Sequence, residues 1–296
     1  MGALTDGGFP ADVTSLVGRR SELAELKRLL ADSRLVTLTG TGGVGKTRLA
    51  LQLSREVRRA FHDGAYWVPL AEIGEPDQVG QSVINAVGLR TMGPDATTLL
   101  TDYLRDKRAL LVLDNCEHLV GACAKLSAGL LAACPGVRVL ATSREVLDIA
   151  GERVFAVTPL ALPDEHPDGT HPGGTHADSV VLFADRAAAA APGFTLTPHN
   201  AQAVADLCRH LDGLPLAIEL AAVRVHTLSV EELLQRQNEH HQLLTRRQHH
   251  TTPCHQSLRA TVDWSYDLCS ASRRTARPSD AWRSRATPGR SPGTPR

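Results

Sequence analysis

The stretch Gly40–Thr47, GTGGVGKT, decides the fold of this 296-residue chain. It follows the apolar run Leu35–Thr39 and opens the helical pattern Lys46–Arg59, so a glycine-rich turn joins a strand to a helix. Glycines let the backbone bend so tightly that successive N–H groups and the helix N-terminus surround one point. A phosphate group fits such a point, so the stretch predicts a phosphate-binding loop (P-loop).

Each residue of this loop has an expected role in holding ATP or ADP. Lys46 would reach the β- and γ-phosphate oxygens, and the Thr47 hydroxyl would bind Mg²⁺. Lys46 is one of only four Lys against 28 Arg, so a compact ammonium at this position favours the functional interpretation. The predicted nucleotide contacts of the loop are Gly40, Thr41, Gly42, Gly43, Val44, Gly45, Lys46, Thr47 and Arg48.

The residues around the loop carry four more short apolar runs, with helical patterns between most of them. Strands that are buried on both faces of a sheet have this composition. The sequence therefore predicts an α/β fold, a P-loop domain over residues 16–160 with a parallel five-stranded sheet covered by helices. The four further runs are Ala65–Leu70, Leu110–Leu113, Val137–Thr142 and Val154–Val157.

Two of these runs end in residues that suit nucleotide chemistry. Asp114 follows the apolar run Leu110–Leu113 in ALLVLDN and would hold Mg²⁺ together with Thr47, at the carboxyl edge where α/β sheets bind ligands. Arg144 ends VRVLATSR and could contact the γ-phosphate, although a surface arginine that caps the strand is an equal alternative. The predicted catalytic residues are Lys46, Asp114 and Arg144.

The general base stays open. Asn115 follows Asp114, and an amide cannot take a proton from water. Glu117 or His118 could replace it, but each also fits the start of the following helix. The sequence therefore predicts slow ATP hydrolysis or none.

The rest of the chain divides into segments that differ in composition and in helical pattern. Residues 1–15 predict a flexible lead-in and residues 161–178 a linker. Residues 179–254 predict a helical domain, in which Ser229 and Glu232 form a capping box. Residues 271–296 predict a disordered Arg/Pro-rich tail. His240, His241, His249, His250 and His255 fit no closed zinc pattern, so no metal beyond Mg²⁺ is expected.

Composition limits location and partners. Basic and acidic residues balance at 32 each, but seven Arg lie in the last 26 residues, so this tail is the sole basis for DNA binding and no DNA partner is expected for the chain. Six Cys without a CxxC pair fit a reducing cytoplasm. Neither a leader nor a membrane span is expected.

Five motifs in one order resemble the NB-ARC type of STAND ATPase, and more narrowly the ATP-binding regulators of actinobacteria with LuxR-type or SARP-type DNA-binding domains. The resemblance implies that Val17, Gly18 and Arg19 lie against adenine or ribose, and that Pro215 packs on the adenine. It also implies that ADP holds a closed monomer, which ATP opens to self-associate. The motifs are LVGRRSEL (Leu16–Leu23), GTGGVGKT, LLVLDNCEHL (Leu110–Leu119), LATSRE (Leu140–Glu145) and LDGLPLAIELAA (Leu211–Ala222).

The chain also departs from that family. Residues His255–Ser270 resemble the beginning of its winged-helix domain, but the later histidine that reaches the β-phosphate is missing, which suggests a truncation or a reading-frame change. The expected function is an ATP/ADP-dependent switch module that could associate with full-length relatives. The alternatives are an ADP-binding remnant that does not hydrolyse ATP, and a P-loop kinase, against which GLPLA argues.

Overall fold

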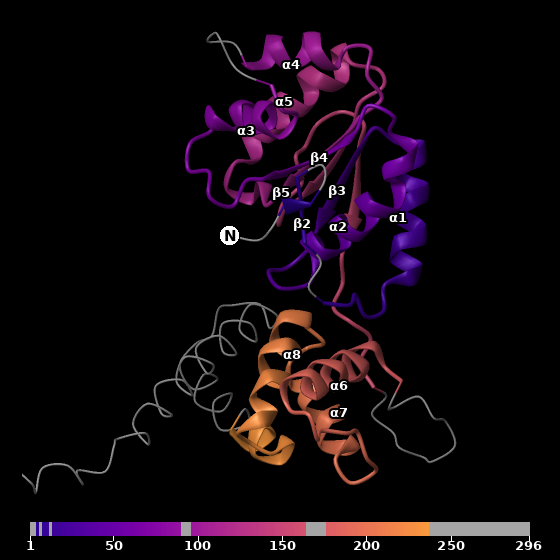
Figure 1. The fold of residues 1–296 in the computed structure, drawn as a ribbon, viewed down its shortest axis with the longest axis vertical. Helices are drawn as coiled ribbons and strands as arrows, with labels where there is room; N and C mark the ends of the chain where they lie inside the picture. Colours follow the sequence, from indigo (N-terminus) through magenta and orange to yellow (C-terminus); the bar gives the residue numbers. More distant parts are fainter. Residues whose placement is uncertain (1–3, 6–7, 12–13, 90–95, 164–175, 237–296) are drawn as a thin grey trace, which may run out of the picture.

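The computed structural model describes residues 4–5, 8–11, 14–89, 96–163 and 176–236, which form an α/β part and a helical part (Figure 1). The predicted winged-helix segment 255–270, the tail 271–296 and the five clustered histidines lie outside the described residues. Most of the predicted linker also lies outside them.

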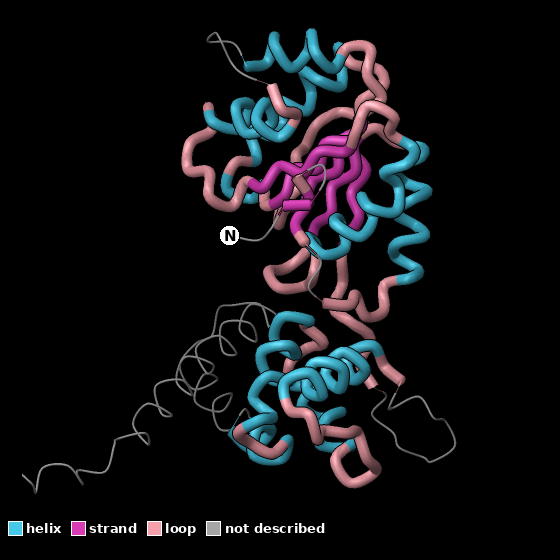
Figure 2. Tube along the Cα trace, in the orientation of Figure 1, coloured by secondary structure: helices cyan, strands magenta, loops and turns pink. Residues whose placement is uncertain are grey.

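The α/β part is built on one five-stranded parallel sheet, drawn in magenta in Figure 2. Its strand order is β4-β5-β6-β3-β7, and in this register Val36 of β3 lies opposite Leu140 of β6 and Arg153 of β7. This confirms the predicted sheet. The strands are β3 (Leu35–Thr39), β4 (Ala65–Pro69), β5 (Leu110–Asp114), β6 (Arg138–Thr142) and β7 (Glu152–Ala156).

One strand differs from the prediction of burial on both faces. In β7, Val154 is 49% exposed, and Phe155 is the residue of this strand that is buried. The reason is position, because β7 is an edge strand that pairs only with β3 in this sheet.

Helices cover both faces of the sheet (Figure 1). Helices α1 (Arg20–Asp32) and α2 (Lys46–Val57) pack on one face, and α1 buries Leu23, Leu26 and Leu30 as their spacing predicts. The opposite face carries α3 (Gln78–Ala86), α4 (Ala96–Leu104) and α5 (Val120–Ala133). None of the described helices has the length and apolarity needed to cross a membrane.

The helical part contains α6 (Asp178–Ala190), α7 (Ala201–His210), α8 (Pro215–Ala222) and a helix over 230–236. The capping box forms as predicted, since the Ser229 N–H donates to the Glu232 carboxylate at 2.9 Å and the Glu232 N–H donates to the Ser229 hydroxyl at 3.2 Å. Phe183 and Ile218 belong to the same apolar core as α1 and α2, so the two parts share a continuous core.

Part of the N-terminal segment packs on the rest of the protein. Strands β1 (Leu4–Thr5) and β2 (Phe9–Pro10) pair antiparallel, and the Phe9 ring is 3% exposed with its centroid 6.0 Å from that of Trp67. A buried aromatic ring anchors the segment, a contact that local composition does not reveal.

Candidate functional site

The P-loop joins β3 to α2 and requires its glycines. Gly40, Gly43 and Gly45 have φ angles of 145°, 78° and 99°, which L side chains rarely adopt. A Cβ on Gly40 would also lie 2.6 Å from the Val157 carbonyl oxygen. The backbone can therefore fold tightly around an anion, as the sequence predicts.

Lys46 begins α2 and turns back into this loop. Its Nζ donates to the carbonyls of Gly40 at 2.8 Å and Thr41 at 3.0 Å. Burial lowers the pKa of Lys46, while the charge of Glu117, and less that of Asp114, raises it. The ammonium thus lies within the loop and close to two carboxylates.

Asp114 lies at the carboxyl end of β5, facing the P-loop. Its Oδ1 accepts hydrogen bonds from the Thr47 hydroxyl at 2.8 Å and from the Thr142 hydroxyl at 2.6 Å. Burial raises the pKa of Asp114, and the two hydroxyls oppose this shift. A hydroxyl and a carboxylate in contact are the hard oxygen donors that Mg²⁺ prefers, so Thr47 and Asp114 fit the predicted metal.

Replacing Asp114 by asparagine should stabilise the nucleotide-free protein. Because the folded state raises the pKa of this carboxyl, the charged form is disfavoured, and stability falls as pH rises from the unfolded value through the folded one. At neutral pH the charge therefore costs stability, and each kcal/mol regained would raise Tm by about 2–4 °C. Calorimetry at pH 7 and near pH 4 checks this, since the gain should shrink at the lower pH. An equal or lower Tm for Asp114→Asn at pH 7 would contradict it.

Arg144 follows β6 and binds Glu117. The Nε–H of Arg144 donates to Glu117 Oε1 at 3.1 Å, and the Arg144 side chain is 56% exposed. Glu117 belongs to the short 3₁₀ helix η2 (Cys116–His118). His118 points elsewhere, because its Nε2 lies 2.8 Å from the Ile73 carbonyl oxygen. Of the two candidate bases, Glu117 is therefore the one whose charge acts on Lys46 of the P-loop.

Residues 17–19 lie between the P-loop and α6. The Nη2 group of Arg19 donates to the carbonyl of Val44 at 3.3 Å and to the carbonyl of Thr158 at 2.7 Å. A Cβ on Gly18 would lie 2.5 Å from Asp178 Oδ2, so the helical part approaches closely here. Val17 packs against the apolar core. Contact of these three residues with adenine or ribose stays a prediction.

The N-terminus of α8 rests on the P-loop. The Leu216 N–H donates to the Gly43 carbonyl at 3.2 Å, and Pro215 Cγ would lie 4.0 Å from a Cβ on Gly45. Pro215 pre-sets the helical φ angle at this first position. The GLPLA motif therefore places the helical part directly beside the phosphate-binding loop.

Comparison with known families agrees with this arrangement. Residues 20–161 match the model of the NB-ARC domain. This chain contains an NB-ARC domain.

Relatives and solved structures extend the comparison beyond the NB-ARC domain. The chain is 41% identical over 263 residues to the uncharacterized protein Rv0894 of Mycobacterium tuberculosis, covering 88% of this chain and 64% of that protein. It is 44% identical over 245 residues to Rv0890c of the same organism, provisionally named an HTH-type transcriptional regulator, covering 82% and 26%. The chain thus spans less than two thirds of either relative.

One solved structure supports the fold. The Walker-type ATPase PABY2304 of Pyrococcus abyssi has a TM-score of 0.52 and 14% identity, and the match covers 89% of this chain and 79% of that chain.

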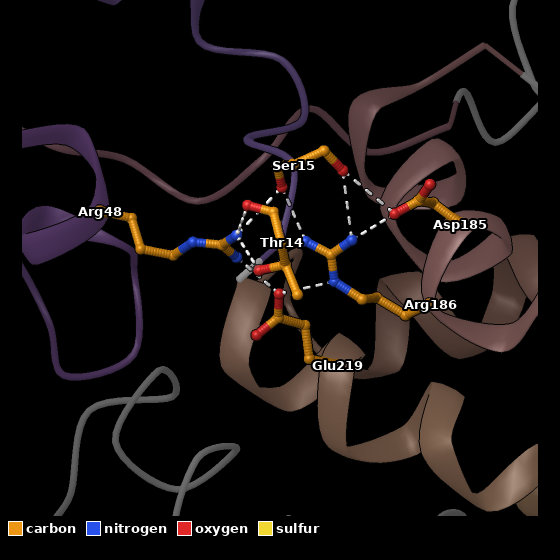
Figure 3. A network of polar contacts seen from close by, with 6 residues as sticks. All are labelled: Thr14, Ser15, Arg48, Asp185, Arg186 and Glu219. Atoms are coloured by element: carbon orange, nitrogen blue, oxygen red, sulfur yellow. Dashed lines mark hydrogen bonds and ion pairs between the residues drawn. The ribbon is translucent and has the colours of Figure 1, made fainter. Parts of the chain in front are cut away.

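Arg48 of the NB-ARC domain is expected to contact the nucleotide, but its guanidinium lies at the boundary with the helical part (Figure 3). It donates to Glu219 Oε1 of α8 at 2.7 Å and to the carbonyls of Thr14 at 2.9 Å and Ser15 at 3.0 Å. Contact of Arg48 with the nucleotide stays a prediction, and in this structure its guanidinium pairs with Glu219, a partner that the loop pattern does not reveal.

Arg186 of α6 completes this arrangement. Its Nε donates to the same Glu219 Oε1 at 3.0 Å, its Nη2 donates to the Ser15 carbonyl at 2.7 Å, and it pairs with Asp185. The Arg186 side chain is 10% exposed. We call Thr14, Ser15, Arg48, Arg186 and Glu219 the junction network, since they join the N-terminal segment, the NB-ARC domain and the helical part. Sequence reasoning missed Arg186 and Glu219, although Glu219 lies within the LDGLPLAIELAA motif.

A basic pocket of about 460 Å³ lies at the amino edge of the sheet, away from the P-loop. Two of its arginines hold helix ends, since Arg34 donates to the Cys134 carbonyl after α5 and Arg138 donates to the Leu30 carbonyl in α1. Cations at the carboxyl ends of helices have a stabilising role, which accounts for these two side chains.

Proposed function

We propose that this chain is the ATP/ADP-binding switch module of a transcriptional regulator, with slow Mg²⁺-dependent ATP hydrolysis. The observation that carries the proposal is the contact of α8 with the P-loop through Leu216 and Gly43. A nucleotide on the P-loop would lie next to the helical part, and a ligand that contacts two parts shifts the balance between their closed and open arrangements.

The residues of the site have separate roles in this proposal. The P-loop N–H groups and Lys46 would bind the phosphates, and Thr47 and Asp114 would hold Mg²⁺, which supplies positive charge beside the phosphate oxygens when bound. The Arg144 side chain is 56% exposed and donates its Nε–H to Glu117, so its Nη groups could add a contact that only the γ-phosphate offers. ATP would thereby hold Arg144 through its γ-phosphate, whereas ADP would not.

The name of the relative Rv0890c supports a place in transcription control. We propose that opening of the junction network allows self-association or association with a full-length relative. DNA binding is not proposed for this chain. We also propose a cytoplasmic location, where ATP is present and where the four described cysteines, all free thiols, stay reduced.

Nucleotide bound to the purified protein is expected to be ADP with some ATP. Chromatography of the released nucleotide tests binding directly, and release of ³²P phosphate from ATP, compared with Lys46→Ala, tests hydrolysis. Bound ADP without phosphate release would favour the non-hydrolysing alternative. Protein that neither retains nor binds ADP or ATP would refute the switch.

A further inference from the structure

The carboxylate of Glu117 is held beside the P-loop with one oxygen unused. Oε1 accepts from the Nε–H of Arg144, but Oε2 is buried and has no hydrogen-bond partner among the described residues. The Glu117 side chain as a whole is 17% exposed. A buried carboxylate oxygen without a donor is costly, so its presence calls for a donor that arrives with a ligand.

The backbone explains how this side chain reaches the site. Asn115 has φ 72° and ψ 49°, the left-handed conformation that asparagine tolerates better than most residues. Its N–H donates to the Thr142 hydroxyl at 2.9 Å, which ties the turn to β6. The turn starts η2, and η2 returns Glu117 towards Lys46, whose ammonium is influenced more by Glu117 than by Asp114. Asn115 therefore has a structural role, and Glu117 brings a carboxylate to the site from two residues further along the chain.

We propose that Glu117 is the catalytic carboxylate that orients and deprotonates the attacking water, an inference that rests on the ATPase function proposed above. The donor missing at Oε2 is the O–H of that water. Arg144 positions the carboxylate through its Nε–H and leaves its Nη groups for the γ-phosphate, so the base is aligned with the group under attack.

The step balances as follows in atoms and charge. The water oxygen forms a bond to the γ-phosphorus while one water proton passes to Oε2 of Glu117. The bond between the γ-phosphorus and its bridging oxygen breaks, and the electron pair stays on ADP. The proton then leaves Glu117 for the released phosphate or for solvent.

The test compares the full chain with Glu117→Gln, Glu117→Asp and, as a matched control, Glu75→Gln, an exposed glutamate in the loop after β4. Affinity for ATP and ADP is measured by calorimetry, hydrolysis by single-turnover release of ³²P phosphate, and the nucleotide that stays bound after loading with ATP by chromatography. Glutamine keeps the shape and the acceptor for Arg144 but cannot take a proton. Aspartate keeps a carboxylate that can take the proton, but its side chain is shorter by one methylene group.

Glu117→Gln should bind ATP within about 3-fold of the wild type, hydrolyse it about 100-fold or more slowly, and retain ATP where the wild type retains ADP. Glu117→Asp should recover part of the rate, and Glu75→Gln should match the wild type. An unchanged rate for Glu117→Gln, or a loss of ATP affinity as large as the loss of rate, overturns the assignment. A wild type that binds ATP without cleaving it overturns it too and leaves nucleotide binding intact. A wild type that binds neither nucleotide refutes the proposed function itself.

Discussion

Replacement of Lys46 by alanine should weaken ATP binding by about 100-fold or more, as expected when a partly buried cation that contacts an anion is removed. Lys46 is 9% exposed as a whole residue and, without phosphate, its ammonium donates to the Gly40 and Thr41 carbonyls. Phosphate oxygens would replace these neutral acceptors with charged ones, so the lysine contributes most when nucleotide is bound. Calorimetric titration with ATP and Mg²⁺ measures the loss.

The matched control is Lys125→Ala, which removes an exposed lysine on α5. It should leave ATP affinity unchanged. The Lys46→Ala protein should keep its circular dichroism spectrum, because burial of the ammonium opposes what its two hydrogen bonds contribute. ATP affinity within about 3-fold of the wild type would show that the loop does not hold the phosphates in the way its geometry suggests.

Replacement of Glu219 by alanine should speed release of bound ADP by about 10-fold. Glu219 Oε1 accepts from Arg48 at 2.7 Å and from Arg186 at 3.0 Å, so its loss leaves two guanidinium groups near each other without the negative charge between them. Loss of one partner costs about 3–5 kcal/mol in a buried pair and about 0–1 kcal/mol at the surface. Glu219 is 27% exposed, so about 1–3 kcal/mol is expected.

Stopped-flow release of a fluorescent ADP analogue measures this change. Glu231→Ala, an exposed glutamate on the helix over 230–236, is the control and should release ADP at the wild-type rate. Glu219→Gln should release ADP at a rate between those of the wild type and Glu219→Ala, because an amide oxygen still accepts hydrogen bonds but carries no charge. If Glu219→Ala lowers Tm but leaves the release rate unchanged, the junction network supports the fold and does not restrain the nucleotide.

Local sequence patterns predict where helices and strands form, but they do not predict which segments pack against each other. The strand β3, the buried face of α1 and the capping box at Ser229 each depend on residues close in sequence, so spacing alone predicts them. The exposure of Val154 and the packing of Phe9 on Trp67 depend on which segments meet in space. A pattern of apolar residues carries no information on whether a strand lies at the edge of a sheet.

The site divides in the same way. The placement of the glycine-rich loop, Asp114 and Arg144 at one edge of the sheet was predictable, because the carboxyl ends of parallel strands meet there. Arg48 was assigned to the nucleotide because it follows Thr47, yet its partner Glu219 is 171 residues away in sequence. Long side chains at the start of a helix can turn either way, and only the tertiary neighbours decide which way they turn.

The carbonyl of Ser15 is a shared acceptor, since it receives one hydrogen bond from Arg48 and one from Arg186. Coupling between two sites is reciprocal, so displacement of residues 14 and 15 weakens the junction network, and opening of that network releases the Ser15 carbonyl. A partner or a substitution that displaces residues 14 and 15 would therefore alter how quickly nucleotide exchanges.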